Sequence, residues 1–192
     1  MKGMNKKLIT LLALSVFLLA GLVTASQDSE KEEFTGRVVA WATPGSTKTT
    51  TLTMVVEKWT TDEQRQKLVQ ALQEGGSDAL LKEMRKMEVG YVRGPQTLRW
   101  RLNIASSFET DEGRVIRLVT ERPVSFGEAK APTRSRDYEF GVIQFTLDEE
   151  GKGEGALIPT AKVYFDKEGK LNIEALGTGP QKLTSVKAKK KK

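Results

Sequence analysis

The 192-residue sequence contains no cysteine and no histidine. Without cysteine the chain has no disulfide bond, no thiolate nucleophile and no cysteine-ligated metal. Without histidine it lacks the commonest general base near neutral pH and the commonest metal ligand. These absences exclude a Ser-His-Asp triad, a histidine-ligated zinc hydrolase and a Cys-His protease. Carboxylate pairs, lysine or tyrosine bases and oxygen-ligand metal sites remain as catalytic options, and we expect no cofactor.

The first 25 residues have the pattern of a signal peptide. Lysines precede an apolar run over Leu8–Val23, and Val23 and Ala25 supply small residues at positions −3 and −1 of a cleavage site. The run is shorter than the roughly 20 apolar residues that a membrane-spanning helix needs. A lipoprotein is excluded because its acylated residue is a cysteine. We therefore predict export to the periplasm or the extracellular space and no mature transmembrane helix, with an uncleaved N-terminal anchor as the alternative.

The net charge of +6 arises from the two ends of the chain. The leader contains three lysines, and the C-terminus contains five, at Lys187, Lys189, Lys190, Lys191 and Lys192. Without these eight lysines, 23 basic residues stand against 25 acidic ones, so the body of the chain is nearly neutral. Specific nucleic-acid binding is not expected, because such a domain carries positive charge on its folded surface. The lysine tail is a candidate contact for a membrane, an anionic polymer or extracellular nucleic acid, and the alternative is a solubilising end without a partner.

Hydrophobic periodicity predicts an α+β fold. Alternating or β-branched segments bounded by turn residues indicate about eight strands, over 34–42, 52–59, 98–108, 114–120, 138–147, 156–165, 171–176 and 183–186. Short turns imply antiparallel neighbours, so we expect a curved antiparallel sheet, either a sandwich or a partly closed barrel. Gly141 is a natural position for a β-bulge because the apolar phase of its strand shifts there.

A helical hairpin is expected after the second strand. Thr60 lies three residues before Glu63, which is the spacing of a capping box, and Gly75-Gly76 permits the positive φ of a helix end. Ser77 then opens a second helix with apolar residues at helical spacing. The expected organisation is a signal peptide over 1–25, a disordered lead-in over 26–33, one α+β domain over 34–186 and a basic tail over 187–192.

Three acidic turns, beginning at Asp111, Asp148 and Asp166, are candidate calcium loops. The turn at Asp148 places Lys152 and Pro159 where an EF-hand loop needs oxygen ligands, so the pattern fails. We interpret the three segments as hairpin turns, in which aspartate and glycine supply the backbone geometry. No metal site is predicted.

Arginines are the main candidate ligand-binding residues. Arg99 and Arg101 share one face of an expected strand, and an antiparallel neighbour would add Arg117 beside them. Three guanidinium groups on one face can hold a carboxylate or phosphate. The alternative is a solvated face balanced by acidic residues such as Glu121 and Glu139. The loop over 122–129 offers Phe126 and Glu128 as contact residues, although Phe126 can equally tuck under the rim of the sheet.

The chain contains three distinctive sequence segments: KWTTDEQRQKLVQALQEGGSDALLKEMRKMEVGYVR, TERPVSFGEA and LDEEGKGEGAL. With them the chain resembles small exported bacterial proteins without an assigned activity, and this resemblance implies export and a single domain but no site residue. The leading hypothesis is a non-enzymatic cell-envelope protein that binds a small molecule or an envelope protein through its sheet and helical lid. The alternatives are a hydrolase or isomerase built on carboxylates, and a structural envelope component.

Overall fold

The computed structural model describes residues 31–43, 46–95, 99–124, 139–165, 171–176 and 179–189. Within these ranges the chain forms ten strands and one helix. In chain order they are β1 (Glu32–Thr43), β2 (Ser46–Val56), α1 (Asp62–Met84), β3 (Gly90–Arg93), β4 (Trp100–Leu102), β5 (Ile104–Thr110), β6 (Gly113–Thr120), β7 (Phe140–Leu147), β8 (Lys152–Phe165), β9 (Leu171–Ala175) and β10 (Gln181–Ala188).

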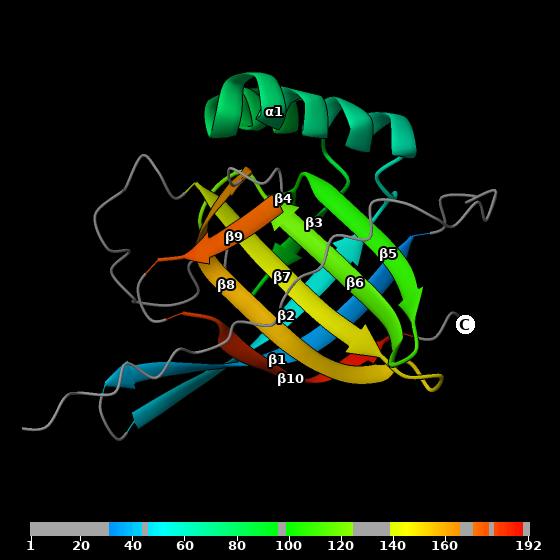
Figure 1. Cartoon of the computed structure of the whole chain (residues 1–192). Helices are drawn as coiled ribbons and strands as arrows, with labels where there is room; N and C mark the ends of the chain where they lie inside the picture. Colours follow the sequence, from blue (N-terminus) through cyan, green and yellow to red (C-terminus); the bar gives the residue numbers. More distant parts are fainter. Residues whose placement is uncertain are drawn as a thin grey trace, which may run out of the picture.

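The strands form a nearly closed antiparallel barrel (Figure 1). Their order is β4-β3-β2-β1-β10-β8-β7-β6-β5, and β9 adds to β8. The two end strands, β4 and β5, are consecutive in sequence and separated only by Asn103. One chain segment therefore pairs first with β3 and then with β6, and the backbone N–H of Asn103 donates to the carbonyl of Val119 at 2.9 Å. This change of partner joins the two ends of the sheet.

The structure confirms the antiparallel, nearly closed sheet but changes several of its details. There are ten strands rather than about eight, because the segment over 98–108 is divided at Asn103 into β4 and β5, and because β3 was not expected. β2 begins at Ser46, since the threonine-rich run before Leu52 pairs with β1. β1 begins at Glu32 and β10 continues to Ala188, so both extend past the expected domain boundaries. The bulge at Gly141 is confirmed by a register shift between its two neighbours.

The segment expected to form a helical hairpin is a single element, α1, in which two helical stretches meet at a kink. Thr61, not Thr60, caps it: the Thr61 hydroxyl accepts from the Gln64 N–H, and the Gln64 side chain accepts from the Thr61 N–H. At the kink Gly76 takes the expected positive φ, 65°, together with a non-helical ψ of −157°. The Ser77 hydroxyl, which donates to the carbonyl of Val163, anchors the chain to β8 at this irregular point.

Two hydrophobic clusters stabilise the fold. The first fills the barrel, where the rings of Phe34 and Phe145 meet edge to face at 5.3 Å. The second lies outside the barrel, where leucines of α1 pack on Phe140 and Val142 of β7 and Ala161 of β8. Burial of these apolar side chains is the main favourable term in a fold without disulfides. The helix thus covers one outer face of the sheet (Figure 1), and the barrel interior is occupied by protein side chains.

Candidate functional site

A polar groove of about 330 Å³ lies on the outside of the barrel. The groove is lined by residues of β3 and β4 and of the loops next to β2, β3, β4 and β6. The lining residues are Glu57, Glu88, Tyr91, Arg99, Arg101, Glu121 and Arg122. We call this set the arginine groove. Its volume falls at the lower end of the range typical of small-molecule sites.

The alternation of side chains along the strands explains why these residues point outward. Val92 of β3 and Leu102 of β4 are fully buried in the barrel core. Successive side chains of a strand project to opposite faces, so Tyr91 and Arg101 project away from the core. The two are direct partners in the β3–β4 register, which places them side by side on the outer face.

Two arginines of the groove are stacked on aromatic rings. The guanidinium carbon of Arg99 lies 4.3 Å from the centre of the Tyr91 ring, and that of Arg122 lies 6.0 Å from the Trp100 ring. The Arg122 Nη2 also donates to the Arg99 carbonyl at 3.5 Å. Within the part of the chain that the structure describes, neither guanidinium has a carboxylate within 4 Å. A guanidinium over an aromatic ring gains a cation–π attraction and keeps N–H groups that can donate to a carboxylate or phosphate.

Carboxylates line the same groove. Glu88 lies 3.3 Å from the Nε of Arg101, and Glu121 lies 3.5 Å from the Nε of Arg85 on the turn after α1. Such exposed ion pairs contribute little to folding stability, typically about 0–1 kcal/mol. The groove therefore combines three arginines with three glutamates, and two of the glutamates already have a cationic partner. Its distinctive chemistry is the pair of stacked arginines.

The buried side chain of Asn103 holds one wall of the groove in place through hydrogen bonds. Its side chain is 0% exposed, and its Oδ1 accepts from the backbone N–H of Glu121 at 2.8 Å. Its Nδ2 donates to the carbonyls of Met84 and Met87, both at 3.0 Å, where α1 ends. One buried amide thus ties the groove wall after β6 to the end of the helix and to the junction of β4 and β5.

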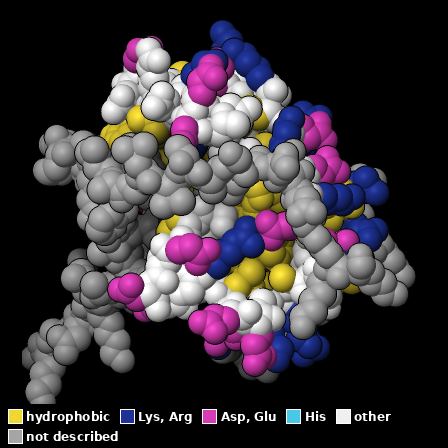
Figure 2. All heavy atoms as spheres, turned by 90° about the vertical axis from the view of Figure 1, so that its right-hand side faces the viewer, with side chains coloured by type: hydrophobic (Ala, Val, Ile, Leu, Met, Phe, Trp, Pro, Cys, Tyr) yellow, Lys and Arg dark blue, Asp and Glu magenta, His cyan; other side chains and the backbone are white. Residues whose placement is uncertain are grey.

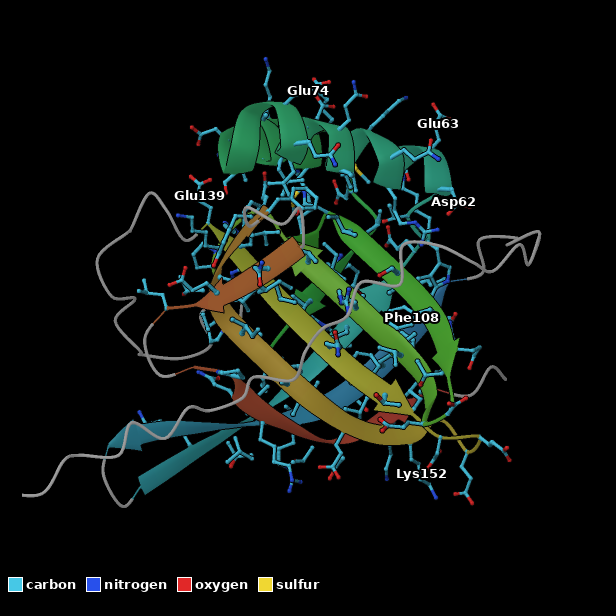
Figure 3. The ribbon with its side chains drawn as sticks, in the orientation of Figure 1. Asp62, Glu63, Glu74, Phe108, Glu139 and Lys152 are labelled. Atoms are coloured by element: carbon cyan, nitrogen blue, oxygen red, sulfur yellow. The ribbon has the colours of Figure 1, made fainter. Side chains whose placement is uncertain are left out.

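The structure brings together only two of the three arginines predicted to share a site. Arg99 and Arg101 line the groove, whereas Arg117 lies on β6, beside Ser106 of β5 and Gln144 of β7. The Arg117 Nε donates to Gln144 Oε1 at 2.9 Å and its guanidinium lies 5.5 Å from the ring of Phe108. Burial lowers the pKa of Arg117 below the usual arginine value. Figure 3 shows Phe108 on β5, where its side chain is 41% exposed.

Arg114 of β6 is held near the start of β1 by an ion pair. Arg114 forms a bidentate pair with Glu32, with both N–O distances at 2.8 Å, and its Nε donates to Ser107 at 2.7 Å. The hydrogen bond to Glu32 raises the pKa of Arg114. Figure 2 shows the side of the molecule that carries β5, where hydrophobic atoms are exposed between basic and acidic side chains. Because Arg114 is fully occupied by its partners, we assign it to the fold rather than to a ligand site.

The other sequence predictions have mixed outcomes. Lys187 is an exposed residue of β10, and Lys189 pairs with Glu33 at 3.2 Å, while Lys190, Lys191 and Lys192 lie outside the described residues. Phe126 and Glu128 also lie outside them.

The turn at Asp148 is a hairpin turn, as predicted, because Asp148 Oδ1 accepts from the N–H groups of Glu150 and Lys152. In the described ranges no three acidic side chains cluster in a way that fits a metal ion.

Sequence reasoning missed Tyr91, Glu57 and Glu88 as groove residues and did not associate Arg122 with Arg99. Side-chain alternation along β3 indicates that Tyr91 faces outward, but the sequence does not show that this strand pairs with β4.

Among the described residues no helix is both long and apolar enough to cross a membrane. No protein family, no curated protein and no solved structure matches this chain. The resemblance to small exported bacterial proteins therefore stays a prediction.

Proposed function

We propose that the protein is an exported, non-enzymatic binding protein of the cell envelope that holds an anionic ligand in the arginine groove. The observation that carries this proposal is the pair Arg99 and Arg122, each stacked on an aromatic ring and without a carboxylate partner among the described residues. Two oriented guanidinium groups can form parallel hydrogen bonds to the oxygens of a carboxylate or a phosphate. Arg101, the third arginine of the groove, is paired with Glu88.

The walls of the groove narrow the class of ligand. Its volume of about 330 Å³ suits a small molecule or the end of a larger one. Glu57 supplies an exposed carboxylate near the arginines, so a ligand that also carries a hydroxyl or an ammonium group gains a second anchor. We therefore favour a small hydroxylated or zwitterionic molecule with one carboxylate or phosphate over a fully apolar ligand.

Native mass spectrometry of the exported protein tests the proposal. We expect the wild-type protein to retain a copurified anionic molecule that is released by acid, and the Arg99→Gln/Arg122→Gln variant to lose it. The Lys67→Gln/Lys82→Gln variant removes the same charge from exposed positions of α1 and serves as the matched control. Equal retention of the molecule by both double variants, or its absence from the wild type, would contradict the proposal.

A carboxylate-based hydrolase or isomerase remains the second candidate, because Glu57, Glu88 and Glu121 line the same groove. The ion pairs of Glu88 and Glu121 with arginines favour a role in shaping the groove. The third hypothesis, a structural envelope component, is supported by the filled barrel interior. Turnover of a groove ligand that disappears in Glu57→Gln but persists in Arg99→Gln would replace our proposal with the enzymatic one.

Export is part of the same proposal and rests on the leader sequence. Fractionation of cells that express the full chain, with antibody detection, is the test. We expect a shortened protein outside the cytoplasm. A full-length protein confined to the cytosolic fraction would refute export without affecting the binding chemistry of the groove.

A further inference from the structure

The outer face of β3, β2, β1 and β10 carries a regular array of cationic and hydroxyl side chains. The inward side chains of these strands include Phe34, Val38, Leu52, Met54 and Leu183, which fill the barrel core. By alternation the residues between them project outward. Within this outward set we call eight cationic and hydroxyl residues the cationic face: Arg93, Thr49, Thr51, Thr53, Thr35, Arg37, Thr184 and Lys187. Glu33, Val39, Val55, Tyr91 and Lys182 project to the same side.

The strand register arranges this face in rows. One row runs across four strands, because Arg93 pairs with Thr53, Thr53 with Thr35, and Thr35 with Lys187. In the next row Arg37 pairs with Thr51 on one side and Thr184 on the other. Neighbouring strands lie about 4.8 Å apart, so Arg93 and Lys187 are about 14 Å apart along the row. Figure 1 places β1 and β10 on the side of the barrel away from α1.

The three cations of this face are exposed and open to a ligand. Arg37, Arg93 and Lys187 are all solvent-exposed, and none has a carboxylate within 4 Å in the ranges that the structure describes. The acidic residues nearest in register are already neutralised: Glu154 pairs with Lys182 at 3.0 Å and Glu33 pairs with Lys189 at 3.2 Å. The face therefore has a net positive charge, although the chain body as a whole is nearly neutral.

Threonine hydroxyls stand between the cations. Thr184 donates to the Arg37 carbonyl at 3.3 Å, whereas Thr35, Thr51 and Thr53 have no side-chain hydrogen bond to any other described residue. A free hydroxyl both donates and accepts. An array of hydroxyls between guanidinium and ammonium groups is therefore complementary to a surface that alternates anionic groups with hydroxyls.

We propose that the cationic face binds an acidic polysaccharide, a polymer with carboxylates or other anionic groups on successive sugar residues. Charge complementarity selects a polyanion, and the threonine rows match the sugar hydroxyls. A membrane would require apolar side chains to insert, and single-stranded nucleic acid would require aromatic side chains to stack on its bases. Phe108 and Tyr164, the large hydrophobic side chains exposed in the described ranges, both belong to strands outside this face.

This proposal does not depend on the arginine groove, which lies over β3, β4 and the loops beside them. It also does not require the last three lysines, because Lys187 already belongs to β10. Lys187 thus links the lysine-rich C-terminal segment to the cationic face.

The test measures binding of polygalacturonate to the full exported chain at about 0.05 M salt, where charges are weakly screened. The Arg37→Gln/Arg93→Gln/Lys187→Gln variant removes three positive charges from the face. The matched control, Lys67→Gln/Lys82→Gln/Lys86→Gln, removes the same charge from α1 and the turn after it. Neutral dextran, anionic phospholipid vesicles and single-stranded DNA are measured in parallel, and thermal melting confirms that each variant is folded.

We expect the face variant to lose about tenfold or more in affinity for polygalacturonate, whereas the control variant changes by less than about twofold. Thr51→Val/Thr53→Val, which keeps shape and charge, should lose about threefold. Equal affinities of the face and control variants would overturn the proposal. Tighter binding of vesicles or DNA than of polygalacturonate, lost in the same face variant, would also overturn it, because the partner would belong to another class.

Discussion

Replacement of Asn103 by alanine is the sharpest test of how this barrel closes. The variant removes three hydrogen bonds: one from the Glu121 N–H at 2.8 Å and two to the carbonyls of Met84 and Met87 at 3.0 Å. Asn103 is fully buried, so its former partners lose their hydrogen bonds without gaining free access to water. At about 1 kcal/mol for each bond, we expect a loss of about 3 kcal/mol in the free energy of unfolding.

Urea unfolding followed by far-UV circular dichroism measures this loss, and Tm should fall by about 6–12 °C for a domain of this size. Ser106→Ala on the adjoining strand β5 is the control, with an expected change below about 0.5 kcal/mol. A loss below about 1 kcal/mol for Asn103→Ala would refute the argument that this amide joins α1, β6 and the β4–β5 junction.

Asn103→Asp separates the donor from the acceptor role of the side chain. The new carboxylate can still accept from the Glu121 N–H, but it faces two carbonyl oxygens in a buried site. Its folded-state pKa should therefore lie above the ordinary aspartate value of about 3.9. The stability of this variant relative to wild type is then greatest below that ordinary value and falls as pH rises through the folded-state pKa. A pH-independent difference between pH 3 and 7 would contradict this account.

Three further predictions concern the core and the barrel end. Gly155→Ala should cost about 2 kcal/mol or more, measured by urea unfolding, because the added Cβ would meet the backbone oxygen of Gln144. Leu81→Ala should cost about 2–4 kcal/mol by the same assay, since it opens a cavity between α1 and the sheet. A double-mutant cycle of Arg114→Ala and Glu32→Ala should give a coupling energy of about 1 kcal/mol or more, and additive effects would contradict the bidentate pair.

Local patterns predicted most of the individual strands, although β3 was missed. The strand expected over 114–120 corresponds to β6, which begins at Gly113, and the bulge at Gly141 follows from the phase shift in its strand. A Cβ at Gly141 would press against Val124 and Thr120, so glycine also satisfies a close approach there. These features depend on neighbours in sequence or on side-chain alternation, which a single sequence contains.

The closure of the barrel could not be predicted in the same way. The alternation of apolar residues continues without a break through Asn103, yet the chain changes its partner from β3 to β6 at that residue. The helix shows a similar limit. Gly76 correctly marks an interruption, but whether the chain turns back or continues depends on packing against β8.

The candidate site was predicted in part for the same physical reason. Arg99 and Arg101 are two residues apart on one segment, so strand alternation alone places them on one face. Arg117 and Arg122 are on or just after β6, and only the strand order decides which of them approaches Arg99. Arg117 pairs in register with Gln144, whereas Arg122 lies past the strand end, where the chain reaches the groove. Register between distant segments carries no local sequence signal.

The most direct test of the central claim is an NMR titration of the wild-type protein with inorganic phosphate, observing the arginine side-chain Nε–Hε signals. The account predicts saturable shifts at Arg99 and Arg122, with no comparable shifts at Arg101, Arg114 and Arg117, whose Nε groups are already paired with Glu88, Ser107 and Gln144. Shifts that are equal at all five arginines, or absent from the groove, would contradict the claim that aromatic stacking prepares this groove for an anion.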